Sequence, residues 1–469
     1  MIDICSLSAS ALAAAVNRGV VQPYAVAEAF LDRVARINPT INALVHCPVT
    51  DVLTQADVLT KRLVNGEKPP LAGVPVVIKD NIWVNGWRVT QGSLLFRDFV
   101  APTDALAVTR LRTAGALLLG LGNCPEFACR GVTENRVYGV TRNPWDLHRT
   151  PGGSSGGCAS AVAAGLAPLA IGTDAGGSIR RPAAHTGIIG LMPTPGHIPH
   201  PIGFPEPAFG NNSLGAFARY SDDLWLMMQC LTASRHLQPI VKFTRHTAAR
   251  LRIGYSFDMG LDSRVELDVT DCLSTVVRIL QRAGLQVQPF QPLWPAAPAG
   301  LRETAIEALE QSALAVLYGQ RLEAEPELFD PEVARQIEAG LRCSGQDVAR
   351  ALYARQALAE DYRRNFADLD VIICPSTPVT AWHLGQDYPQ EIAGTVAAPR
   401  DHAVFSWFVN QAFATACSLP CGLDSQGLPI GLQLLAPSGQ EETLQLLSHV
   451  LLQYLYDEIG NTCQYPSKP

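Results

Sequence analysis

Two glycine-rich segments stand out in this chain: GGSSGG at residues 152–157 and GTDAGGSIRRP at residues 172–182. Both contain serine, and mostly small residues separate them. Glycine at this density lets the backbone approach another backbone or a ligand closely, including at positions that need a positive φ. Free main-chain N–H groups in such loops can bind an anion or a developing oxyanion. The two loops therefore indicate a site around which the rest of the chain is organised.

The first loop admits two interpretations from its residues alone. A phosphate-binding loop would need Gly-Lys-Ser/Thr after the glycines, and Cys158 follows Gly157 instead. Residues 153–157 match G-x-S-x-G, which would make Ser155 a nucleophile-elbow serine. That motif should follow a strand directly, whereas Pro151 precedes it and cannot donate to a sheet ladder. Neither pattern fits fully.

Composition favours a large folded enzyme. Of the 469 residues, 47% are hydrophobic and 17% are charged, which is enough apolar material for a sizeable core. The net charge of −7 gives no electrostatic reason to expect nucleic acid as a partner. No basic region followed by an apolar run opens the chain, and no apolar run reaches the roughly 18 residues of a membrane span. We expect a cytoplasmic protein without a membrane partner.

The twelve cysteines do not form a metal or disulfide pattern. No C-x-x-C pair occurs, so reduced and mostly buried thiols are expected. His197 and His200 flank Pro199, a setting typical of an ordinary loop rather than of metal ligands. The sequence predicts no metal site.

Hydrophobic periodicity predicts alternating helices and strands. Helices at 8–16, 24–37 (with Pro39 beyond its end) and 52–63 form an N-terminal helical layer over residues 1–65. A buried strand at 71–78 leads to Lys79 and is followed by helix 105–114, strand 116–121, helix 159–164 and strand 169–171. A long loop covers residues 192–213, and a helix at 222–231 and a strand at 251–255 follow it. The region 264–368 is mainly helical and is broken by a strand at 285–287. After it come a strand at 371–374, a helix at 405–416, a strand at 430–435 and a helix at 441–455. This alternation predicts an α/β fold with a largely parallel sheet.

Taken in order, several motifs resemble the amidase signature family of serine amidohydrolases. They are LAGVPVVIKD at 71–80, TEN at 133–135, NPW at 143–145, PGGSSGG at 151–157, GTDAGGSIR at 172–180, CPSTP at 374–378, LPCG at 419–422 and GLPIGLQ at 427–433. The resemblance implies one amidase domain over residues 1–469, in α/β/α layers around a large twisted, mixed but mainly parallel sheet. It also implies a helical insertion at about 300–368 that shapes the substrate pocket.

The resemblance further implies a Ser–cis-Ser–Lys triad. Ser178 would be the nucleophile, and Ser154, on a cis peptide, would relay its proton to Lys79. A serine hydroxyl needs such a base to become a good nucleophile. Lys79 must be neutral for this role, and its place after a run of Val and Ile favours the desolvation that lowers an amine pKa. His185 is a weaker candidate for the base.

The second loop would also supply the oxyanion hole and its supports. The implied oxyanion donors are the N–H groups of Ala175, Gly176, Gly177 and Ser178. Asp174 and Arg180 are expected to brace the loop as a buried pair, while Ser155 and Thr173 hold Ser154 and the loop by hydrogen bonds. The reaction requires no metal or organic cofactor.

The substrate is less well defined. Candidate pocket residues are Phe127, Cys129, Ile202, Phe204 and Phe209, an apolar set that suits an aryl or alkyl group. We expect a stand-alone amidase, a monomer or homodimer, that acts on small or aryl/alkyl amides. Alternatives are a carbamate, urethane or urea hydrolase of the same family, and the amidase subunit of a glutamine-dependent tRNA amidotransferase. That subunit usually continues with a Lys-Pro-Thr-Tyr-Gly-Arg run, whereas MPTPGH stands here at 192–197. A catalytically inactive binding protein is disfavoured because all three triad residues are present.

Overall fold

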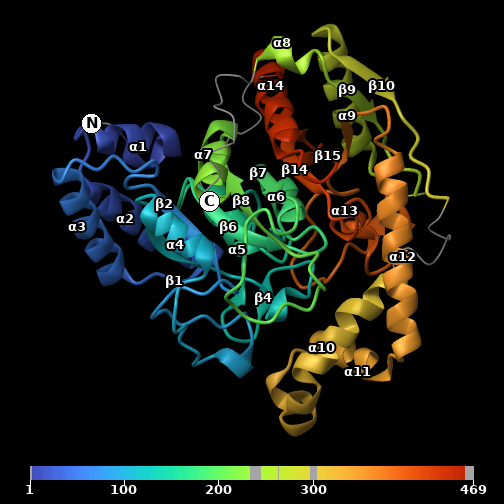
Figure 1. Ribbon diagram of the computed structural model, residues 1–469, viewed down its shortest axis with the longest axis horizontal. Helices are drawn as coiled ribbons and strands as arrows, with labels where there is room; N and C mark the ends of the chain where they lie inside the picture. The colour runs from blue at the N-terminus through green and yellow to red at the C-terminus, as the bar shows by residue number, and fades with distance from the viewer. Residues whose placement is uncertain (1–2, 233–243, 262, 296–303, 460–469) are drawn as a thin grey trace.

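The computed structural model describes residues 3–232, 244–261, 263–295 and 304–459. One eleven-stranded sheet runs through it (Figure 1). In spatial order its strands are β1 (Leu44–His46), β3 (Leu117–Gly122), β2 (Pro75–Lys79), β6 (Leu169–Asp174), β8 (Ser213–Ala218), β7 (Ile189–Met192), β14 (Thr415–Leu423), β15 (Pro429–Ala436), β11 (Val371–Pro375), β9 (Arg252–Tyr255) and β10 (Gln286–Pro289). Strands from both halves of the sequence thus share one sheet.

The expected α/β fold with a mixed sheet is confirmed, but the sheet is not mainly parallel. Strand β2 pairs in parallel with β3 and β6, and β9 pairs in parallel with β10 and β11. All pairings between β6 and β11, through β8, β7, β14 and β15, are antiparallel, as is that of β1 with β3. The expectation was wrong here because it did not include β7, β8 or β14, which with β15 connect the two parallel parts.

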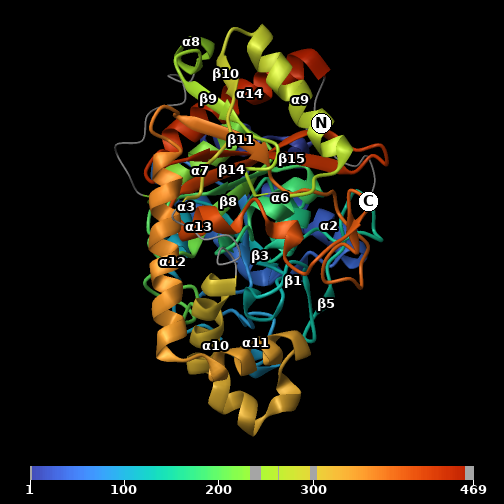
Figure 2. The same cartoon turned by 90° about the vertical axis from the view of Figure 1, so that its right-hand side faces the viewer.

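Helices cover both faces of the sheet (Figures 1 and 2). The helices are α1 (Ala9–Asn17), α2 (Pro23–Ile41), α3 (Val49–Val64), α4 (Leu106–Thr113), α5 (Gly156–Ala163), α6 (Arg180–Thr186), α7 (Ser221–Thr232), α8 (Arg245–Ala248), α9 (Leu267–Arg282), α10 (Thr304–Ala324), α11 (Pro331–Arg342), α12 (Gly345–Arg364), α13 (Trp407–Gln411) and α14 (Glu441–Ile459). Alternate residues of β2 face opposite ways, as a strand requires. Val76 belongs to the hydrophobic cluster that includes residues of α4, α7 and α14, whereas Val77 belongs to the cluster that includes residues of α2 and α5.

The N-terminal helices agree closely with the expected ranges. The side chain of Ser8 caps α1 by accepting a hydrogen bond from Ala11 N. Helix α2 is longer than expected, because it includes Pro39 and ends at Asn42, a residue with a φ of 48°. Proline in the last turn lacks only one N–H and does not stop the helix there. Strand β1, which was not expected, lies between α2 and α3.

A second correction concerns residues 405–416. Only Trp407–Gln411 is helical, and Thr415 already begins strand β14. Phe413 lies between them with a φ of 52°, in the left-handed region that a helix does not continue through. The motif CPSTP lies at the end of β11 and LPCG lies in β14, and β15 separates these two strands in the sheet.

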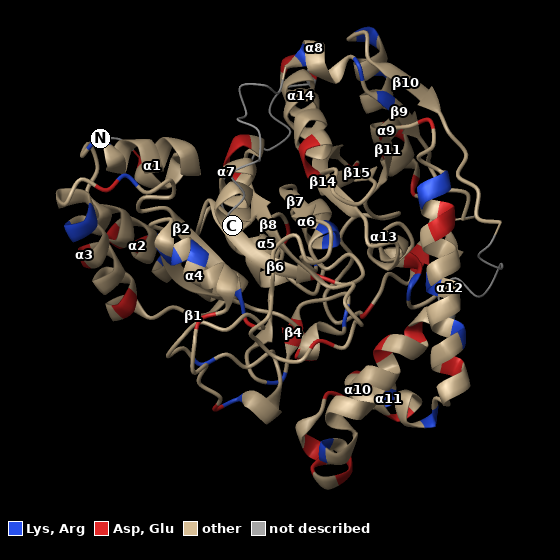
Figure 3. Ribbon diagram, in the orientation of Figure 1, with Lys and Arg blue, Asp and Glu red and all other residues tan. Residues whose placement is uncertain are grey.

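The region expected as a helical insertion contains α10, α11 and α12, while residues 300–303 lie outside the described residues. Helices α10 and α11 pack on each other at one end of the molecule, and α12 runs along its side (Figure 2). Charges of both signs are interspersed along α10 and α12 (Figure 3). Each described cysteine is a free thiol. Of the described helices, none is long and apolar enough to cross a membrane.

Candidate active site

Lys79 lies at the point where β2 ends, beside the carboxyl end of β6. Because β2 and β6 are parallel neighbours, Lys79 and Thr173 reach the same edge of the sheet. The Lys79 side chain is fully buried, and its Nζ lies 2.7 Å from Ser154 Oγ and 2.8 Å from Thr173 Oγ1. Asn81 Nδ2 also donates to Thr173 Oγ1, at 3.1 Å. The sheet topology thus brings together a lysine and a serine that are far apart in sequence.

The first glycine loop brings Ser154 to Lys79 through close backbone packing. The Gly153–Ser154 peptide is cis, as the resemblance implied. A Cβ at Gly153 would lie 2.5 Å from the carbonyl oxygen of Val132, so no larger residue fits there. Ser155 lies beside it but faces elsewhere, since its Oγ donates to the carbonyl oxygen of Thr173 at 3.2 Å. Ser155 is fully buried and lines none of the described cavities.

Burial lowers the pKa of Lys79 to about 8, so a substantial fraction of its amine is neutral near neutral or mildly basic pH. The neighbouring Asp80 does not pair with it. Asp80 accepts hydrogen bonds from Thr90 N, Thr90 Oγ1 and Gly92 N, and burial raises the pKa of its carboxyl to about 7. The two adjacent side chains have separate partners, which leaves Lys79 in contact with hydroxyl groups alone.

Ser178 lies between β6 and α6 and faces open space. It lines a cavity of about 480 Å³ and also a smaller recess, which Ser154 lines as well. The carbonyl oxygen of Ser178 accepts a hydrogen bond from Ser155 N at 3.1 Å, so the two glycine loops are bonded to each other. Of the candidate nucleophiles, Ser178 is the one that a substrate in the cavity can reach.

The second loop is braced as expected, with one change at the oxyanion hole. Asp174 and Arg180 form a fully buried ion pair, with Arg180 Nη2 and Asp174 Oδ1 3.0 Å apart. Gly177 N donates to Asp174 Oδ1 at 2.6 Å. That N–H is therefore not available to an oxyanion, and the expectation for Gly177 was wrong. Ala175, Gly176 and Ser178 line the cavity, so their N–H groups remain the candidates for binding an oxyanion.

His185 does not take part in this arrangement. It lies in α6 with its ring edge-on to Trp382, at a centroid distance of 5.3 Å. Burial lowers the pKa of its imidazole to about 3. Among the described contacts, no hydrogen bond joins His185 to Ser154, Ser155 or Ser178. Likewise, within the described ranges no group of His, Cys, Asp and Glu side chains could hold a metal ion.

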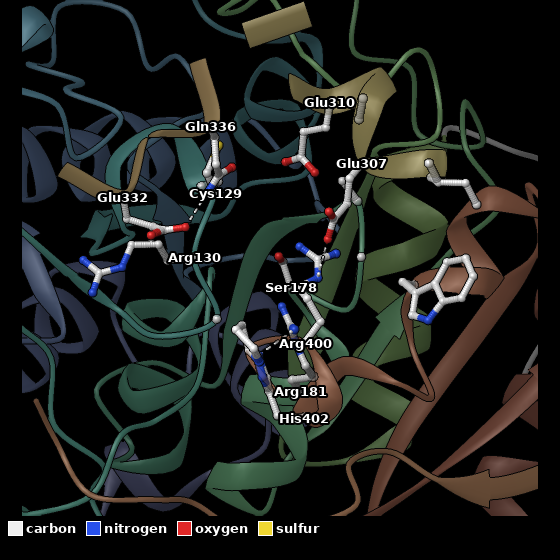
Figure 4. A pocket seen from close by; sticks show the side chains of 18 of the residues that line it. Cys129, Arg130, Ser178, Arg181, Glu307, Glu310, Glu332, Gln336, Arg400 and His402 are labelled. Atoms are coloured by element: carbon white, nitrogen blue, oxygen red, sulfur yellow. Dashed lines mark hydrogen bonds and ion pairs between the residues drawn. The ribbon is translucent and has the colours of Figure 1, made fainter. Parts of the chain in front are cut away.

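The cavity is far more polar than the expected pocket residues suggest (Figure 4). Its charged and ionisable lining consists of Cys129, Arg130, Arg181, Glu307, Glu310, Glu332, Arg335, Asp387, Tyr388, Arg400 and His402. Helices α10 and α11 supply four of the acidic and basic groups in this set, so the helical insertion does form one wall.

Of the five expected pocket residues, only Cys129 lines this cavity. Phe127 and Phe204 line the smaller recess, where Phe127 stacks on Tyr318 and Phe204 packs against Phe96. Ile202 and Phe209 are 39% and 45% exposed and line none of the described cavities. Three of the five expected residues therefore lie at a cavity that Ser178 lines, Phe127 and Phe204 at the smaller recess and Cys129 at the larger, more polar cavity.

Residues that sequence reasoning missed include Arg181, Glu310, Arg400 and His402, all in the cavity wall. The one available signal was the repeated arginine after Ser178-Ile179, which places a second cation one helical turn from the nucleophile. Glu310 and Arg400 lie in segments without a recognisable motif, so only the fold brings them to the site.

Comparison with known proteins agrees with this geometry. The family model "Amidase" matches residues 25–445. The A subunit of the glutamyl-tRNA(Gln) amidotransferase from Deinococcus deserti is 35% identical over 95% of this chain and 96% of its own length. Among solved structures, a bacterial aryl acylamidase of the amidase signature family superposes with a TM-score of 0.89 at 25% identity, covering 99% of both chains. A protein from a complex that reveals the origins of an s-triazine catabolic enzyme superposes with a TM-score of 0.86 at 29% identity, covering 95% of this chain and 98% of its own.

The fold and these similarities define an amidohydrolase, an enzyme that cleaves carbon–nitrogen bonds other than peptide bonds. The chain belongs to the amidase signature family.

Proposed function

We propose that this chain acts alone as a hydrolase of small polar amides, through an acyl-enzyme on Ser178. The proposal rests on one observation above all: Lys79 Nζ lies 2.7 Å from Ser154 Oγ, in a fully buried position next to the cavity that Ser178 lines. A buried, partly neutral amine in contact with a serine hydroxyl is suited to general-base catalysis.

The reaction would proceed in two halves. Ser178 Oγ attacks the amide carbonyl carbon while its proton passes to Ser154 and the proton of Ser154 passes to Lys79. The oxyanion is held by the N–H groups of Ala175, Gly176 and Ser178, each worth about 3–4 kcal/mol of transition-state stabilisation. The proton on Lys79 returns through Ser154 to the leaving nitrogen. Water then attacks the acyl group by the same relay and frees Ser178.

Labelling with a fluorophosphonate tests this assignment. Ser178→Ala should abolish both covalent labelling and amide hydrolysis, because the nucleophilic oxygen is gone. Ser155→Ala is the matched control, since it removes the neighbouring buried hydroxyl that lines none of the described cavities. Labelling that survives in the first variant and disappears in the second would assign the nucleophile to Ser155.

The amidotransferase subunit is the second candidate, favoured by the names of the curated relatives. It predicts glutaminase activity that depends on added partner subunits, whereas the stand-alone enzyme turns over amides unaided. Carbamate or urea hydrolysis would use the same relay, and a panel of amides, carbamates and ureas separates these chemistries. The proposal includes a cytoplasmic enzyme, monomeric or homodimeric, without cofactor, membrane or nucleic acid partner.

A further inference from the structure

Two arginines from distant parts of the chain meet in the wall of the cavity that Ser178 lines (Figure 4). Arg181 lies in the first turn of α6, three residues after Ser178. Arg400 directly precedes the short helical turn Asp401–Ala403. We call Arg181 and Arg400 the arginine pair. The fold alone brings these two cations to the same cavity as the nucleophile.

Arg181 is buried, with 7% of its surface exposed, yet the described hydrogen bonds of its side chain are to uncharged groups. Nη1 lies 3.2 Å from His402 Nε2, Nη2 donates to the carbonyl oxygen of Gly153 at 3.2 Å, and Nε has no partner. Among the ion pairs of the described residues, none includes Arg181. A guanidinium stays protonated in proteins, and a buried one is normally paired with an anion. The buried guanidinium of Arg181 therefore lacks the anionic partner that such a group normally has.

The charges around Arg181 increase this need. Burial, and after it the nearby Arg400, lowers the pKa of Arg181 to about 9. His402 adds no charge, because its pKa is held well below the usual range by burial and by Arg181. On the opposite wall, Glu307 lies 3.9 Å from Arg400, and burial raises the pKa of Glu310. Glu307 thus pairs with Arg400, whereas Asp174 and Glu310 act on Arg181 only from a distance, and no ion pair among the described residues joins either of them to Arg181.

We propose that the arginine pair binds a carboxylate of the substrate, so that the preferred substrates are short amides that also carry a carboxylate. The inference rests on the proposed function and specifies its substrate class. Arg181 N donates to the carbonyl oxygen of Gly177 at 2.9 Å, and Arg181 lines the same cavity as Ser178, so its guanidinium lies within a short reach of the nucleophile. A carboxylate fits a guanidinium through two parallel hydrogen bonds, and a short spacer would then put the amide carbon at Ser178 Oγ.

Three amides of matched length test the charge preference: succinamate, its neutral isostere succinamide and the cationic 3-aminopropanamide. We expect kcat/KM for succinamate to exceed that for succinamide by about 100-fold, the value of one charged hydrogen-bonded contact. In Arg181→Gln this ratio should fall to near one. Arg181 also donates to the carbonyl oxygen of Gly153, beside Ser154, so kcat/KM should drop for both substrates in this variant. The ratio of the two values then distinguishes loss of carboxylate binding from displacement of Ser154. Arg400→Gln should lower the ratio at least tenfold.

Arg335→Gln provides the matched control. Arg335 lines the same cavity, but its side chain is 70% exposed and pairs with Glu332. In this variant the succinamate-to-succinamide ratio of kcat/KM should stay within about twofold of the wild-type ratio, because an exposed, paired charge contributes little to binding.

A wild-type preference for succinamide or 3-aminopropanamide would overturn the inference. An Arg181→Gln variant that slows both substrates equally would also overturn it and leave Arg181 as a positioning residue. In both cases Ser178 still reacts with the fluorophosphonate and amides still turn over, so the proposed function stands. If every amide is inert and Ser178 is not labelled, the proposed function and this inference fall together.

Discussion

Arg180 and Asp174 meet in a doubly hydrogen-bonded ion pair with no exposed surface. Arg180 Nε lies 3.1 Å from Asp174 Oδ2, and Arg180 Nη2 lies 3.0 Å from Asp174 Oδ1. Gly177 N, Ile179 N and Asn410 Nδ2 also donate to this carboxylate. The guanidinium and these donors hold the pKa of Asp174 well below its usual range, despite burial. The pair joins the end of β6 to the start of α6 and so fixes the turn that carries Ser178.

Removing one partner of this pair should be costly. Arg180→Met should lower the free energy of unfolding by about 3–5 kcal/mol, because it leaves a buried carboxylate uncompensated. Arg252→Gln is the control, since Arg252 and Asp370 form a half-exposed pair that contributes little to stability. Equilibrium unfolding in urea measures both. Equal losses in the two variants would contradict the bracing role of the Asp174 pair.

The pH dependence of hydrolysis should report the titration of Lys79. Its pKa is lowered from 10.5 to about 8, and only the neutral amine can accept a proton. The value of kcat/KM should therefore rise about tenfold per pH unit below pH 8 and level off above it. Initial rates between pH 5 and about 9 test the slope. Activity that is highest near pH 5 and falls toward pH 8 would rule out a neutral lysine as the base.

Replacing the lysine should separate catalysis from stability. Lys79→Met keeps most of the side-chain volume, while it removes the amine and with it the cost of burying a charge. We expect kcat/KM to fall about 10²–10⁴-fold, the usual contribution of a general base. Thermal unfolding should change by only a few degrees. A variant with nearly full activity would refute the role of Lys79, and one that fails to fold would show a structural role instead.

Two glycines in the first turns of helices should respond oppositely to alanine. Within a helix, Gly→Ala normally stabilises by about 1 kcal/mol, and Gly345→Ala in α12 should do so because nothing lies within 4 Å of the added Cβ. At Gly157 in α5 the Cβ would lie 2.1 Å from Asn123 N and 2.6 Å from the carbonyl oxygen of Ala43. Gly157→Ala should therefore destabilise, and comparison of the two urea midpoints tests this. A stabilised Gly157→Ala variant would mean that β1 and β3 do not pack on α5 in this way.

Local sequence patterns predicted the elements whose residues follow one clear period. The strand that ends at Lys79 and the N-terminal helices are examples. Strands β7 and β8 were missed because both are buried along their whole length and show no alternation of apolar and polar residues. Residues 405–416 suggested a helix because α13 and the start of β14 are both apolar, and only the backbone turn at Phe413 separates them.

In the site, too, the residues that lie in local sequence motifs could be predicted, and those that only the fold brings together could not. Lys79, Ser154 and Ser178 lie in contiguous motifs that resemble those of the amidase signature family, so their roles could be proposed from that resemblance. The cavity wall could not be predicted, because it depends on contacts between segments more than a hundred residues apart, such as Arg181 with His402. Of the apolar residues of the long loop, Phe204 lines the smaller recess, with its ring 4.8 Å from that of Phe96, while Ile202 and Phe209 line none of the described cavities.

Helices α10 and α11 provide a wall of the cavity but none of the three residues of the proposed relay. The relay comes from β2 and from the two glycine loops, which pack into the sheet. Mutations in the two helices can therefore change which molecule is accepted while the bond-breaking chemistry stays intact. In evolutionary terms, one contiguous stretch of the gene can diversify under selection for new substrates, and the reaction itself is inherited unchanged.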